Sequence, residues 1–95
     1  MDSEQRILFR IGFLHSQVSS IFNAMKHILR GTEDCEQSQT NIAYVKNQVG
    51  DLIVQTQLLC DQLDIDYKTC ENLGWKRYKK MKSNWEKKGY GDKWV

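Results

Sequence analysis

The chain has 95 residues and contains no proline. Average usage would place about five prolines in a chain of this length. Because a proline in a helix interior costs about 3 kcal/mol or more, their absence permits long, uninterrupted helices. Hydrophobic residues make up 40% of the chain, which argues against a disordered polypeptide. These features predict one small, ordered, all-α domain.

Residues 1–30 carry the spacing of an amphipathic helix. Asp2 followed three residues later by Gln5 matches a capping box, and Gly31 is a typical helix stop. The apolar positions recur in alternating steps of four and three residues: Ile7, Ile11, Leu14, Val18, Ile21, Met25 and Ile28. We therefore predict a first helix over residues 1–30 with a wide apolar face.

A second helix is predicted over residues 38–63, after a polar connection in which Ser38 or Thr40 offers a cap. Its apolar positions follow the same spacing: Ile42, Val45, Val49, Leu52, Thr56, Leu59 and Leu63. Two long helices joined by a short polar connection tend to fold back on each other. The expected arrangement of these two helices is therefore a long antiparallel hairpin.

A third, basic helix is predicted over residues 67–88. Asp66 is placed to cap it, and Gly89 ends it, which leaves residues 89–95 as a tail. The sequence thus predicts a single helical domain composed of a hairpin, a basic helix and a short tail.

The net charge of +2 averages two unlike parts of the chain. Residues 1–66 hold five Lys and Arg against nine Asp and Glu, a balance of −4, whereas residues 67–95 hold nine against three, a balance of +6. Basic residues interleaved with aromatic ones are typical of proteins that bind single-stranded nucleic acid. The same pattern also fits a helix that packs its aromatic face and leaves its lysines in water. An anionic partner is expected at the C-terminal part.

Size favours self-association. A domain of this length buries only about 60 to 70% of the surface that its unfolded chain exposes. A second copy would cover further apolar area, so we expect a dimer or a higher homo-oligomer with a four-helix core.

The cysteines and the N-terminus indicate where such a chain resides. Cys35, Cys60 and Cys70 are odd in number and lack CxxC spacing, and no basic leader precedes an apolar stretch. The prediction is a cytoplasmic protein with reduced thiols. No apolar run reaches the roughly 18 to 20 residues of a membrane span, so no membrane partner is expected.

Residues 48–78 carry the most informative pattern. A Gly-Asp pair lies inside an apolar helix, a break of the type LxID follows, and Asn-Leu then precedes Lys-Arg-Tyr. The residues concerned are Gly50, Asp51, Leu63, Ile65, Asp66, Asn72, Lys76 and Arg77. This pattern resembles the MazG-like, all-α nucleoside triphosphate pyrophosphatases, and the resemblance extends over roughly residues 10–80.

The resemblance implies a magnesium-dependent reaction that releases a nucleoside monophosphate and pyrophosphate. Four carboxylates hold the magnesium ions in the family, and by position they correspond to Gln17, Ser20, Gln48 and Asp51. Only Asp51 is an acid here. Glutamine can offer a neutral carbonyl oxygen, but it cannot neutralise the cation or serve as a general base.

The resemblance therefore suggests a divergent MazG-like nucleotide-binding protein, with Asp51 as the candidate ligand for Mg²⁺. The candidate nucleotide contacts are Gln17, Gln48, Asn72, Lys76 and Arg77. No catalytic residue is assigned. Two alternatives stay open: an active, Mg²⁺-dependent nucleoside triphosphate pyrophosphohydrolase, and a nucleic-acid-binding or protein-interaction module that uses the basic aromatic third helix.

Overall fold

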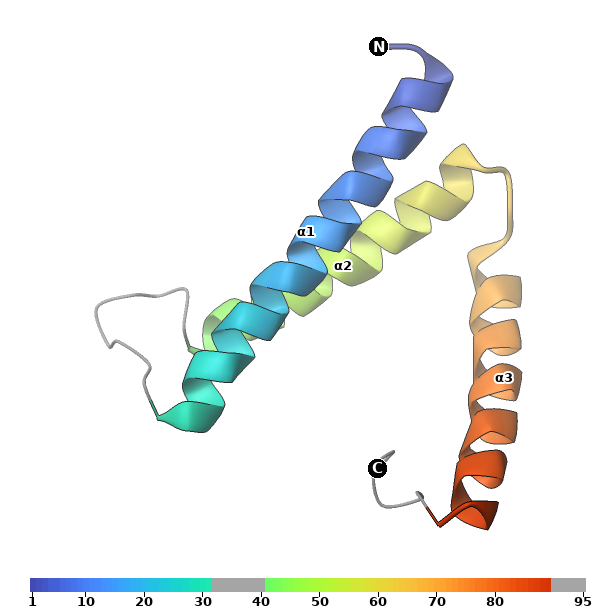
Figure 1. Cartoon of the computed structure of the whole chain (residues 1–95). Helices are drawn as coiled ribbons and strands as arrows, with labels where there is room; N and C mark the ends of the chain where they lie inside the picture. Colours follow the sequence, from blue (N-terminus) through green and yellow to red (C-terminus); the bar gives the residue numbers. More distant parts are fainter. Residues whose placement is uncertain (32–40, 90–95) are drawn as a thin grey trace. The chain divides into compact units, whose positions relative to one another are not determined.

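The computed structural model describes residues 1–31 and 41–89, which form three α-helices and no strand (Figure 1). The helices are α1 (Ser3–Arg30), α2 (Ile42–Gln62) and α3 (Tyr67–Lys87). The all-helical class is thus confirmed for the described part of the chain. Within that part, no helix combines the length and apolar character that crossing a bilayer demands. The predicted tail beyond Gly89 lies outside the described residues.

Both ends of α1 follow the sequence signals. The Asp2 carboxylate accepts a hydrogen bond from the Gln5 backbone N–H at 2.8 Å, and the Gln5 amide oxygen accepts one from the Asp2 N–H at 3.0 Å. This is the predicted capping box. Gly31 adopts a left-handed conformation with φ of 67°, and its N–H donates to backbone carbonyls of the last turn.

The predicted start of α2 is wrong. The helix begins at Ile42, and its N-cap is Asn41, whose side chain accepts a hydrogen bond from the Tyr44 N–H at 2.9 Å. Ser38 and Thr40 lie outside the described residues. Asparagine caps a helix as well as serine or threonine does, so the residue adjacent to the apolar pattern takes this role.

The chain divides into two compact units, Met1–Leu63 and Asp64–Val95. In the first unit, α1 and α2 lie side by side (Figure 1). The interior of this pair is small. Among the described residues, the buried apolar side chains are Ala24, Val45 and Cys60, and the buried polar side chain is Gln17.

Most of the buried and half-buried residues of α1 and α2 fall in two neighbouring rows on each helix, with members seven residues apart, although the buried Cys60 lies outside both rows. One row is apolar and contains Ile7, Leu14, Ile21 and Ile28 on α1 and Val45, Leu52 and Leu59 on α2. The second row, which we call the polar row, contains Arg10, Gln17 and Ala24 on α1 and Gln48, Gln55 and Gln62 on α2. The apolar stripe predicted from the sequence is therefore only partly correct, because Ile11, Val18, Val49 and Leu63 are exposed.

In the second unit, Asp66 caps α3 as predicted. Its carboxylate accepts hydrogen bonds from the Thr69 backbone N–H at 2.9 Å and from the Thr69 hydroxyl at 2.8 Å. Within α3, the rings of Trp75 and Tyr78 meet edge to face, with centroids 6.0 Å apart. The helix ends at Lys87, one residue before the predicted end, and Lys88 is its C-cap.

The Asp66 cap makes the start of α3 sensitive to acid. Two hydrogen bonds from Thr69 lower the pKa of the Asp66 carboxyl below its usual range. The bond from the hydroxyl has the larger effect, and the bond from the backbone N–H has the smaller one. Because the folded-state pKa is lowered, the stabilisation is complete at neutral pH and disappears as the pH falls through the lowered value. We expect the protection of the Thr69 amide against hydrogen exchange, taken relative to its intrinsic exchange rate at each pH, to fall in acid, measured by NMR. Asp66→Asn should keep the cap and remove this pH dependence; an unchanged pH dependence in that variant would contradict the assignment.

Candidate functional site

Gln17 has the most constrained polar side chain of the first unit. It lies in the middle of α1 and is only 4% exposed. Its Oε1 atom is buried and has no hydrogen-bond partner in the structure of the described residues. A buried polar atom without a partner costs about 1 to 3 kcal/mol, so such atoms are rare unless something else satisfies them.

Gln48, the second glutamine at a position that matches a family acid, is half-buried on α2. The other two matching positions differ from these glutamines. Ser20 is half-buried, and its hydroxyl donates to the Ser16 carbonyl at 3.1 Å. Asp51 is exposed. Of the four positions, only Gln17 is therefore buried, whereas Ser20 and Gln48 are half-buried.

These four positions do not fit a magnesium site. Protein-bound Mg²⁺ is usually held by one or two carboxylates together with substrate phosphates and water. Asp51 is the only carboxylate of the set, and the described residues contain no group of three His, Cys, Asp or Glu side chains placed to hold a metal ion. We therefore derive no metal-dependent step from this site.

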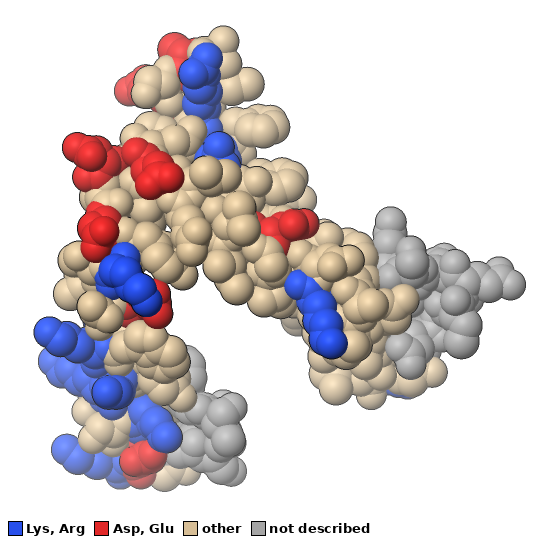
Figure 2. Space-filling model, turned by 180° about the vertical axis from the view of Figure 1, so that it is seen from behind, with Lys and Arg blue, Asp and Glu red and all other residues tan. Residues whose placement is uncertain are grey.

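Asn72, Lys76 and Arg77 all belong to α3, in the second unit, whereas Gln17 and Gln48 belong to the first. All three α3 side chains are exposed. Figure 2 shows Lys and Arg side chains gathered over α3. The surface of this helix agrees with the charge asymmetry seen in the sequence.

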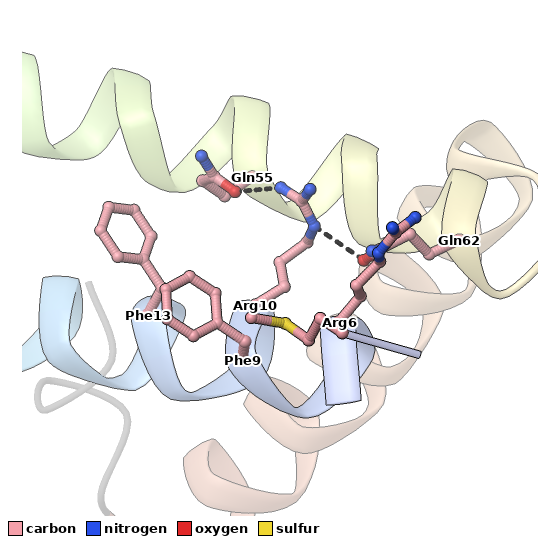
Figure 3. A pocket seen from close by; sticks show the side chains of 7 residues that line it. Arg6, Phe9, Arg10, Phe13, Gln55 and Gln62 are labelled. Atoms are coloured by element: carbon pink, nitrogen blue, oxygen red, sulfur yellow. Dashed lines mark hydrogen bonds between the residues drawn. The ribbon is translucent and has the colours of Figure 1, made fainter. Parts of the chain in front are cut away.

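The structure contains a pocket in the first unit that the sequence analysis missed (Figure 3). Its volume is about 300 Å³. The lining residues are Met1, Arg6, Phe9, Arg10, Phe13, Gln55 and Gln62. The available signal was a charged residue, Arg10, one position before Ile11 of the predicted apolar stripe, together with glutamines seven residues apart on the second helix.

Two amides hold the Arg10 guanidinium at this pocket. Its Nε atom donates to Gln62 Oε1 at 2.7 Å, and its Nη1 atom donates to Gln55 Oε1 (Figure 3). Arg10 is half-buried, and no carboxylate lines the pocket. The amides orient the guanidinium without neutralising it, so the pocket keeps its positive charge.

Comparison with protein-family models, curated proteins and solved structures finds no match to this chain. The MazG-like resemblance accordingly stays a prediction that rests on the residues quoted above.

The unpartnered Gln17 amide leads to a prediction about stability. Gln17→Leu removes a buried oxygen without a partner and keeps a side chain of similar size. We expect the free energy of unfolding to rise by about 1 to 3 kcal/mol, measured by urea titration. Gln57→Leu, the same change at an exposed position of α2, serves as the control and should shift stability by less than about 0.5 kcal/mol. A destabilised Gln17→Leu protein would contradict the prediction that this oxygen is unsatisfied in the folded state.

Proposed function

We propose that this chain is a divergent MazG-like protein that binds a nucleotide between α1 and α2 and does not hydrolyse it. The observation that carries the proposal is the buried, unpartnered amide oxygen of Gln17, at a position where the family has an acid. Buried polar atoms of folded proteins nearly always have a hydrogen-bond partner, and in this proposal the ligand is the partner of Gln17.

The contacts of Arg10 support an antiparallel hairpin as the scaffold. Arg10 lies in the first half of α1, whereas Gln55 and Gln62 lie in the second half of α2. Moving one seven-residue step from Arg10 along α1 and from Gln55 back along α2 reaches Gln17 and Gln48. Glutamine amides offer both donors and acceptors, which suits the edge of a nucleobase.

The phosphate contacts that the family resemblance implies on α3, Asn72, Lys76 and Arg77, stay a prediction for the second unit taken by itself. All three are exposed, and the guanidinium of Arg77 can donate two parallel hydrogen bonds to a phosphate. The same exposed, basic surface is what the nucleic-acid alternative requires, so nucleic-acid binding by α3 stays a prediction as well.

Nucleotide binding without turnover is directly testable. We expect no monophosphate or pyrophosphate after incubation with ribo- and deoxyribonucleoside triphosphates and Mg²⁺ or Mn²⁺, followed by chromatography. At least one nucleotide should bind in isothermal titration calorimetry. Gln17→Leu should weaken this binding about tenfold, which corresponds to about 1.4 kcal/mol, because a hydrogen bond to the ligand is lost.

The exposed Gln57→Leu variant should bind the nucleotide as the unmodified protein does. Turnover that disappears in Asp51→Asn would establish the hydrolase alternative instead. A nucleotide affinity that is unchanged in Gln17→Leu but lower after charge removal at Lys76 and Arg77 would place the nucleotide on α3.

We further propose that a second copy covers the apolar side of the helix pair. Val18 on α1 and Val49 on α2 both follow the polar row by one residue, as do Ile11 and Leu63. In an antiparallel pair such positions lie on the same side. All four are exposed, and they form an apolar surface of the kind that marks an interface.

Sedimentation equilibrium at micromolar concentration should therefore give a mass of twice 11.2 kDa. Val49→Lys places a charge on the proposed interface and should produce monomers. Val54→Lys alters an exposed valine that lies outside this surface and should leave the dimer intact. A single 11.2 kDa species of the unmodified protein would refute the dimer.

A further inference from the structure

Arg10 is a half-buried cation that lacks a counter-charge. Among the described residues, neither Arg10 nor Arg6 takes part in an ion pair. Removing a charge from water is costly unless an opposite charge or several hydrogen bonds compensate it. Gln55 and Gln62 supply two hydrogen bonds but no negative charge. An anion that enters the pocket would complete the compensation.

Because its hydrogen-bond partners are glutamines, the Arg10 guanidinium keeps its positive charge for a ligand. Glutamate at position 55 or 62 would reach Arg10 equally well and would neutralise it. Glutamine instead fixes the direction of the guanidinium and leaves further N–H groups without a protein acceptor among the described residues. The polar row thus positions a cation and does not form a salt bridge.

Arg6 adds a second positive charge to the same pocket. It precedes Arg10 by four residues on α1, and both residues line the cavity. Like charges at this spacing repel each other within a helix. The first 66 residues carry a net charge of −4, yet no acid lines the pocket. Guanidinium groups can donate paired hydrogen bonds to a phosphate, so two of them at one pocket can serve as an anion site.

Phe13 lines this pocket and lies between Arg10 and the buried Gln17 along α1. It follows Arg10 by three residues and precedes Gln17 by four, so all three lie along one face of α1. Phe13 is 44% exposed and Phe9 is 65% exposed, and Figure 3 shows that both project from the same stretch of α1 as Arg10. An exposed aromatic ring between a cation and an amide offers a surface on which a planar base can stack.

We propose that the pocket between α1 and α2 is the phosphate-binding end of the nucleotide site. Arg6 and Arg10 bind the phosphate groups, and the base stacks on Phe13, which lines the same pocket. The identity of the ligand rests on the proposed function, whereas the anion site rests on the arginines alone.

The test introduces a counter-charge without removing any arginine. Gln55→Glu places a carboxylate beside the Arg10 guanidinium, and Gln57→Glu makes the same charge change at an exposed position of α2. Isothermal titration calorimetry of the full chain would measure the binding of inorganic tripolyphosphate and of a nucleoside triphosphate. We expect Gln55→Glu to weaken both affinities at least tenfold and Gln57→Glu to change them less than twofold. Circular dichroism would confirm that both variants remain helical.

Arg6→Gln provides an independent second variant, because Arg6 is exposed and no hydrogen bond of its side chain would be lost from the described structure. It should also weaken tripolyphosphate binding. Equal affinities of the unmodified, Gln55→Glu and Arg6→Gln proteins would overturn the anion site and leave nucleotide binding elsewhere unaffected. Tripolyphosphate binding that needs the arginines, without a preference for nucleotides, would support the anion site and count against the proposed function.

Discussion

The first unit depends on the polar row that runs along the contact between α1 and α2. Each helix buries an apolar row next to a row that contains arginine, glutamine or alanine, so the pair is held by packing on one side and by amides on the other. Arg10 is fixed by this row, and Gln17 is buried by it. Such an interior gains less from apolar burial than an all-leucine contact would, and each unpaired polar atom reduces the gain further.

This arrangement explains why so much apolar surface faces outward. Because polar side chains occupy half of the contact, the hydrophobic residues of α1 and α2 extend past it to the adjoining sides of the helices. A pair of helices with three buried apolar side chains among its described residues is a weak unit by itself. Association of two copies and occupation by a ligand would then contribute to the stability of the same structure.

Features that depend on neighbouring residues could be predicted from the sequence, whereas the contacts between the two helices could not. The Asp2 capping box, the Gly31 stop and the Asp66 cap each depend on a few neighbouring residues, so spacing alone revealed them. The contacting rows were harder to predict, because α1 is apolar over several adjoining rows and periodicity does not identify which row meets a partner. The Arg10 pocket was missed since its members come from positions 10, 55 and 62, which only the packing of α1 on α2 brings together.

The seven-residue repeat of the polar row also affects the register in which α1 and α2 pack. Arg10 meets glutamines at two successive repeats of α2, and Gln48 provides a third, so a slide of α2 by one repeat would still offer arginine an amide. Hydrogen bonding by itself therefore leaves the register degenerate. Ala24 interrupts the repeat with the smallest side chain of the row, and it is buried, as is Val45. Close packing around such small buried side chains tolerates few alternative alignments, so it can restrict the register where hydrogen bonding to Arg10 does not.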